Sequence, residues 1–99
     1  KDPHMPLFVI LAQDKPGGHR LRMSTRPEHV AFLEGLGASL KVAGPFLDAE
    51  GKPNGSLVII EADDLAAAQA IAAADPYAKA GLFASAEVKP WRVGVGSLG

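Results

Sequence analysis

Two stretches of the chain are apolar in both sets of alternate positions. Residues 7–12 read LFVILA, and residues 57–60 read LVII. A strand whose two alternating sets are both apolar is typical of burial on both faces. The pattern therefore predicts two strands, Pro6 to Gln13 and Ser56 to Glu61, at the centre of one sheet.

A helical spacing begins at His29, where apolar residues follow at i+3, i+4 and i+7. This spacing places His29 on the inward stripe of a helix that runs to about Leu36. Pro27 suits the first turn, because its missing N–H would have no intrahelical partner there. The sequence thus predicts a helix entered at residues 25–28, after a polar loop over residues 14–24 that contains a proline and two glycines.

The rest of the chain alternates turn-forming residues with short apolar runs. In order, the predicted elements are a strand over 39–47, a hairpin turn over 48–55, the central strand already named, a helix capped by Asp63 or Asp64 through Ala74, and a strand from Phe83 to about Val93. Strand, helix, strand, strand, helix, strand is the order of the ferredoxin-like βαββαβ arrangement. We expect an α+β fold with one antiparallel sheet and both helices on one face.

Such a sheet leaves one face without helices, yet the two central strands are apolar on that side as well. A second copy of the same face is the simplest cover for it. The sequence therefore predicts a homodimer formed through the open face of the sheet.

Length and composition indicate the domain organisation, the kinds of partner and the cellular location. The 99 residues suit one domain, which we assign to residues 5–93, with a cloning remnant at 1–4 and a flexible tail at 94–99. The charges nearly cancel, so no nucleic-acid or membrane surface is expected. The absence of cysteine and of an apolar run long enough to span a membrane favours a cytoplasmic protein.

Asp75 stands between the alanine-rich helix and Pro76, where an aspartate is typical of a helix N-cap. It could instead orient His29 as an acid/base pair, since a carboxylate that accepts from one imidazole nitrogen fixes the tautomer and leaves the other nitrogen to exchange a proton. One carboxylate could also do both. The pattern of residues alone leaves these interpretations open.

Other residues are candidates for binding a substrate. Arg26 at the helix entrance, with help from Arg22, could hold an anionic group, although solvated arginines are as common. Ser56 could line the same cleft or simply end the hairpin. Tyr77 and Phe46 could form an aromatic wall for a flat substrate or a small satellite core.

No metal site is expected, because the histidines and Asp75 include no closely spaced pair of ligands. No nucleotide-binding motif is present, so no cofactor is expected.

Four motifs, in order along the chain, resemble those of a known family. They are Arg26-Pro27-Glu28-His29, Gly44-Pro45-Phe46-Leu47-Asp48, Gly55-Ser56-Leu57-Val58, and Asp75-Pro76-Tyr77 followed by Ala80-Gly81-Leu82. On these the chain resembles the YCII-related (YciI-like) family of small dimeric α+β barrel proteins. The resemblance implies that His29 and Asp75 form a catalytic pair and strengthens the expectation of a dimer.

Three functions follow. The leading hypothesis is a cofactor-independent enzyme whose His29 and Asp75 transfer a proton in isomerase or lyase chemistry on a small polar or hydroxylated cyclic substrate. A second is a non-catalytic module that binds a small molecule or another protein. A third, a cofactor-free monooxygenase, rests on analogy of fold alone.

Overall fold

The computed structural model describes residues 6–98, so the cloning remnant assigned to residues 1–4 lies outside the described residues. The elements are β1 (Leu7–Asp14), α1 (His19–Gly35), the 3₁₀ turn η1 (Gly37–Ser39), β2 (Leu40–Leu47), β3 (Pro53–Glu61), α2 (Leu65–Ala74), α3 (Pro76–Lys79) and β4 (Phe83–Trp91). Residues 92–98 follow β4 without helix or strand.

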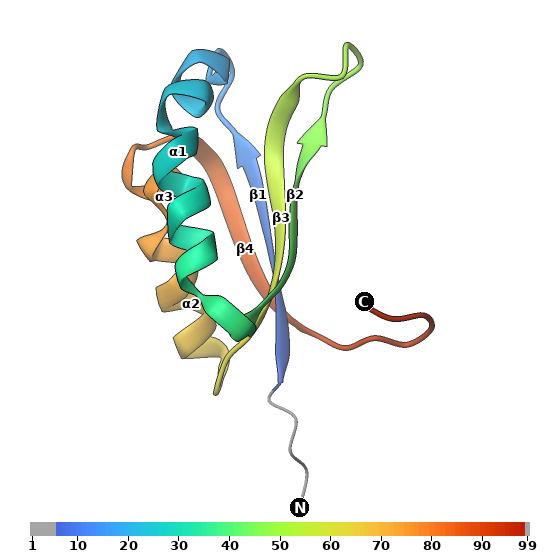
Figure 1. Ribbon diagram of the computed structural model, residues 1–99. Coiled ribbons are helices and arrows are strands. Elements are labelled where there is room, and N and C mark those ends of the chain that lie inside the picture. The colour runs from blue at the N-terminus through green and yellow to red at the C-terminus, as the bar shows by residue number, and fades with distance from the viewer. Residues whose placement is uncertain (1–5, 99) are drawn as a thin grey trace, which may run out of the picture.

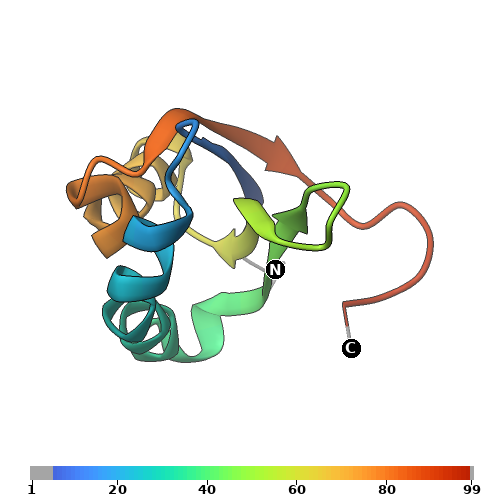
Figure 2. The same ribbon diagram turned by 90° about the horizontal axis from the view of Figure 1, so that it is seen from above.

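The strands form one four-stranded sheet in the order β2-β3-β1-β4, and every neighbouring pair is antiparallel. β1 and β3 are the central strands, as their two-sided apolar pattern predicted. All helices lie on one face of the sheet (Figures 1 and 2). The ferredoxin-like α+β fold is confirmed.

The hydrophobic core lies between this face and the helices. It joins alternate residues of β1 and β3 to α1 and α2: Phe8, Ile10, Leu33, Val58, Ile60, Ala62 and Ala68. Ala68 is fully buried, and its small side chain lets α2 approach the sheet closely while Ile71 packs against the core. Asp64 caps this helix by accepting from the Ala67 N–H at 2.8 Å.

The first helix begins earlier than the sequence indicated. α1 starts at His19, and Pro27 lies inside it rather than at its entrance, so the predicted loop over 14–24 is wrong for most of its length. Its first residue follows Gly18, and no side chain caps it. The added turns carry Arg22, whose buried contacts with the sheet offset the loss of one intrahelical bond at the proline.

The opposite face of the sheet is also apolar, although Val9 and Ile59 at its centre are already buried within the chain. In the register of the sheet, Leu11 faces Leu57 and Val9 faces Ile59, and Ile59 in turn faces Val42. Val42 remains 45% exposed, and Trp91 at the end of β4 remains 40% exposed. We call this surface the open face.

Candidate functional site

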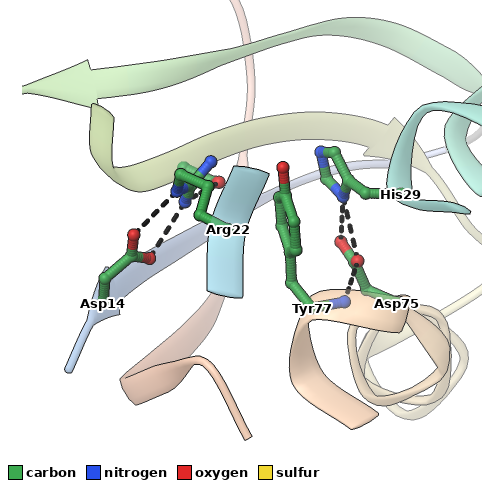
Figure 3. Close-up of polar contacts among 6 residues, drawn as sticks. Asp14, Arg22, His29, Asp75 and Tyr77 are labelled. Atoms are coloured by element: carbon green, nitrogen blue, oxygen red, sulfur yellow. Dashed lines mark hydrogen bonds and ion pairs between the residues drawn. The ribbon is translucent and has the colours of Figure 1, made fainter. Parts of the chain in front are cut away.

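His29 and Asp75 meet although 46 residues separate them in the chain. The Nδ1 atom of His29, on the inward side of α1, lies 2.9 Å from Oδ1 and 3.0 Å from Oδ2 of Asp75 (Figure 3). Oδ1 also accepts from the Tyr77 N–H at 2.9 Å and so caps α3. The N-cap interpretation and the contact with His29 therefore hold together in one carboxylate.

The carboxylate decides the tautomer of His29. An ionised carboxylate only accepts hydrogen bonds, so Nδ1 carries the hydrogen and donates it to Asp75. Nε2 is left with a lone pair in the neutral ring, and among residues 6–98 no side chain hydrogen-bonds to it. Both side chains are about nine-tenths buried, which gives their contact a low-dielectric setting.

Tyr77 fixes the plane of the imidazole. The His29 and Tyr77 rings stack with centroids 3.9 Å apart and planes 17° apart, while Phe83 meets Tyr77 edge-on at 6.0 Å. Burial raises the pKa of the Tyr77 hydroxyl, and the charges of Arg22 and Arg26 oppose that rise only in part. At neutral pH Tyr77 is consequently a neutral hydroxyl able to donate a hydrogen bond.

Arg22 lies over the same tyrosine, with its guanidinium carbon 4.6 Å from the ring centroid. Figure 3 shows Tyr77 standing between Arg22 and His29. The guanidinium forms a two-point pair with Asp14 at 2.7 and 2.9 Å and donates to Ser56 Oγ at 2.9 Å. Burial acts against the charge, but the pair with Asp14 outweighs it and raises the pKa of Arg22.

Sequence reasoning gave Arg22 only a helping role, because it placed this residue in a loop. The signal that could have found it is its spacing to His29. Seven residues separate the two, so in a helix that begins at His19 they share the inward stripe.

A cavity of about 590 Å³ lies between α1 and the β2–β3 half of the sheet, and His29 lines it. Arg22, Arg26, Ser56 and Tyr77 line the same cavity. Arg26 is exposed at its rim and Ser56 is buried within β3. Three of the four residues proposed to bind substrate thus lie around the predicted acid/base pair, while their roles in binding stay predictions.

The structure does not bring Phe46 to this cavity. In the register of the sheet, Phe46 faces Gly55, and a Cβ on Gly55 would lie 3.1 Å from the Phe46 ring. Neighbouring residues of a strand point to opposite faces, so Phe46 lies on the side opposite to Ser56, which lines the cavity. Of the two aromatic residues predicted to form a wall, only Tyr77 lines the cavity.

Among residues 6–98, no group of three or more histidine, cysteine, aspartate or glutamate side chains is placed to hold a metal ion. None of the helices in the described part of the chain is long and apolar enough to cross a membrane.

Two known proteins are similar to this chain over most of its length. Protein YciI of Escherichia coli O6:H1 is 42% identical over 94 residues, covering 87% of this chain and 96% of that protein. A 5-chloro-2-hydroxyhydroquinone dehydrochlorinase from Burkholderia phenoliruptrix, solved in complex with 2,5-dihydroxybenzoquinone, is 36% identical. Its TM-score is 0.83, with 89% of this chain and 95% of that chain covered.

More distant structures share the fold alone. A NIPSNAP family protein from Agrobacterium tumefaciens is 16% identical, with a TM-score of 0.61 over 99% of this chain and 93% of that chain. At the level of family, the model described as the YCII-related domain matches residues 6–92. Together with the 42% identity to YciI, this match confirms the resemblance seen in the motifs, and the chain belongs to the YCII-related domain family.

Proposed function

We propose that this protein is a cofactor-independent enzyme that transfers protons on a small hydroxylated cyclic substrate. The observation that carries the proposal is the contact of His29 Nδ1 with both oxygens of Asp75, which leaves Nε2 free at a cavity of about 590 Å³. A histidine held by a carboxylate in one tautomer is the usual arrangement of a general base.

In the proposed step, the Nε2 lone pair of His29 accepts a proton from a hydroxyl or C–H group of the substrate. The imidazolium that forms is stabilised by the carboxylate of Asp75, and the electron pair left behind enters the substrate ring. Return of the proton to another atom completes an isomerisation. Departure of an anion from the ring completes an elimination, in which the substrate loses one proton and one anion and nothing else.

The similar dehydrochlorinase supports the elimination branch and the class of substrate. That protein acts on a chlorinated hydroxyhydroquinone and was solved with a dihydroxylated quinone, and its sequence is 36% identical to this chain. We therefore propose a ring with several oxygen substituents as the substrate of this protein.

An assay of chloride release tests this function. The purified protein is incubated with 5-chloro-2-hydroxyhydroquinone under argon and in air. We expect chloride release at the same rate in both, and a rate at least ~100-fold lower in the His29→Gln variant, as loss of general acid/base help predicts.

Other results would contradict the proposal in separate ways. Turnover that needs oxygen would favour the monooxygenase, and binding of the ring without turnover would favour the non-catalytic module. A His29→Gln variant that folds and retains the wild-type rate would remove His29 from the mechanism.

We also propose that the protein is a homodimer joined through the open face. The apolar side chains of β1 and β3 on that face, and the exposure of Val42 and Trp91 beside them, support this assembly. The cytoplasmic location expected from the sequence stays a prediction.

A further inference from the structure

Arg22 is a buried cation that the proposed proton transfer does not use. Its Nε–H donates to Asp14 Oδ2, and its Nη2 donates to Asp14 Oδ1 and to Ser56 Oγ. These bonds occupy three of the five N–H groups of a guanidinium. The two N–H groups of Nη1 remain.

Nη1 reaches the cavity. Among residues 6–98, every fully buried side-chain nitrogen or oxygen has a hydrogen-bond partner. Nη1 has none in the described chain, so it keeps some accessible surface, and Arg22 lines the cavity. Figure 3 shows this nitrogen, the one without a dashed line, on the same side as the Tyr77 hydroxyl.

The carboxylates at this end of the cavity are occupied, whereas donors are not, and His29 Nε2 is the free acceptor that the proposed proton transfer uses. Both oxygens of Asp14 bind Arg22, and both oxygens of Asp75 lie against His29 Nδ1. Ser56 Oγ accepts from Arg22, so its own hydrogen is available to a ligand. The remaining charged lining residues, Arg26 and Glu34, are exposed and opposite in sign.

We propose that Arg22 Nη1 and the Tyr77 hydroxyl together bind an ionised oxygen of the substrate. His29 and Arg22 lie against opposite faces of the Tyr77 ring (Figure 3). The charged oxygen of the substrate, near Arg22, and the reacting position, near His29, are therefore on different sides of this ring. The inference rests on the proposed function and narrows its substrate class to rings that carry a phenolate or enolate oxygen apart from the site of proton transfer. Arg22 is in this account a specificity-determining residue.

Binding of two matched quinones tests the inference without turnover. The hydroxyl groups of 2,5-dihydroxybenzoquinone are vinylogous acids and ionise at neutral pH, whereas 2,5-dimethoxybenzoquinone has the same ring and cannot ionise. Affinities are measured from the change in visible absorption of each quinone. We expect the wild-type protein to prefer the dihydroxy compound by at least ~10-fold, the effect of one charge-assisted hydrogen bond.

Two variants remove the donors while keeping the fold. Tyr77→Phe retains the stacked ring, and the double variant Asp14→Asn with Arg22→Gln leaves no unpaired buried charge. We expect each to reduce the preference for the ionised quinone by at least ~10-fold. Arg20→Gln, on the same helix but exposed and outside the cavity lining, is the matched control and keeps the preference.

The outcomes separate this inference from the proposed function. Equal affinity for the two quinones in the wild type, or an unchanged preference in both folded donor variants, overturns the inference while the assay of His29→Gln can still succeed. Binding of neither quinone overturns the inference together with the hydroxylated-ring substrate. A preference that survives in His29→Gln and is lost in Tyr77→Phe supports the inference even if no turnover is found.

Discussion

The two faces of the sheet share the same strands but differ in what completes them. Under the helices, buried polar side chains such as Arg22 and His29 each have a carboxylate partner supplied by another element. On the open face, Ile59 is buried among its neighbours, whereas Leu57 is partly exposed and Val42 is 45% exposed. Directional contacts close the first face within one chain. The second face carries apolar side chains on its central strands and Glu87 and Lys89 on β4, and another copy of the chain can cover it.

The largest expected effect is on assembly. Leu57→Asp places a carboxylate on the open face of a central strand, where a dimer would bury it without a partner. A penalty of several kcal/mol lowers the association constant by about a thousandfold or more, so we expect the native mass to fall from dimer to monomer at micromolar concentration.

Leu65→Asp is the matched control for that change. Leu65 is the first residue of α2 and 39% exposed, away from the open face, so this variant should keep the wild-type mass. A monomeric wild-type protein, or a Leu57→Asp variant that remains dimeric, would disprove assembly through the open face.

The second prediction concerns the stability that the Asp14–Arg22 pair gives to the face of the sheet beneath the helices. Asp14→Ala leaves the Arg22 charge buried without its carboxylate, and we expect the free energy of unfolding to fall by about 3–5 kcal/mol. Glu28→Ala removes a carboxylate at an exposed position of α1, away from the open face, and should change the free energy of unfolding by less than ~0.5 kcal/mol. Urea denaturation measures both, and equal effects of the two substitutions would mean that burial of the Asp14 pair has no energetic weight.

The third effect compares two glycines. A Cβ at Gly55 would lie 2.6 Å from the Ala12 carbonyl oxygen, whereas one at Gly35, the last residue of α1, would meet nothing within 4 Å. We expect Gly55→Ala to lower the free energy of unfolding by about 1–3 kcal/mol through overpacking. Gly35→Ala should raise it by about 0.5–1 kcal/mol, and a loss there would show an unseen constraint at the helix end.

Periodicity was sufficient for the parts of the fold that depend on apolar patterning. The two-sided apolar strands identified β1 and β3 as central, and Asp64 was one of the two caps expected for α2. The predicted start of α1 was wrong because a proline such as Pro27 normally marks the first turn of a helix. The contacts of Arg22 with Asp14 and Ser56 favour the earlier start, and they join residues whose proximity local sequence does not show.

Local sequence patterns predicted less of the candidate site than of the fold. The meeting of His29 with Asp75 spans 46 residues and came from the family motifs, not from spacing. The face that Phe46 occupies is set by its pairing with Gly55 across β2 and β3, and a local motif does not show that pairing.

The smallest expected effect is in the titration of Tyr77, the only tyrosine of the chain. Because burial raises its pKa, we expect the phenolate absorbance to appear with a midpoint above the ordinary value of 10.0. Arg26→Gln should raise the midpoint further, since the Arg26 charge lowers it, and Arg20→Gln should not. A raised pKa stabilises the fold below the ordinary value, and that contribution is lost as pH rises through the midpoint. A midpoint at or below 10.0 would contradict the buried setting of Tyr77.

The most direct test of the acid/base pair is a double-mutant cycle on turnover with 5-chloro-2-hydroxyhydroquinone. His29→Gln, Asp75→Asn and the double variant are compared after each is shown to fold. If the two residues act as one unit, each single variant loses at least ~10-fold, His29→Gln at least ~100-fold, and the double variant loses no more than His29→Gln alone. Losses that multiply in the double variant, or wild-type rates in folded single variants, would contradict a His29–Asp75 catalytic pair.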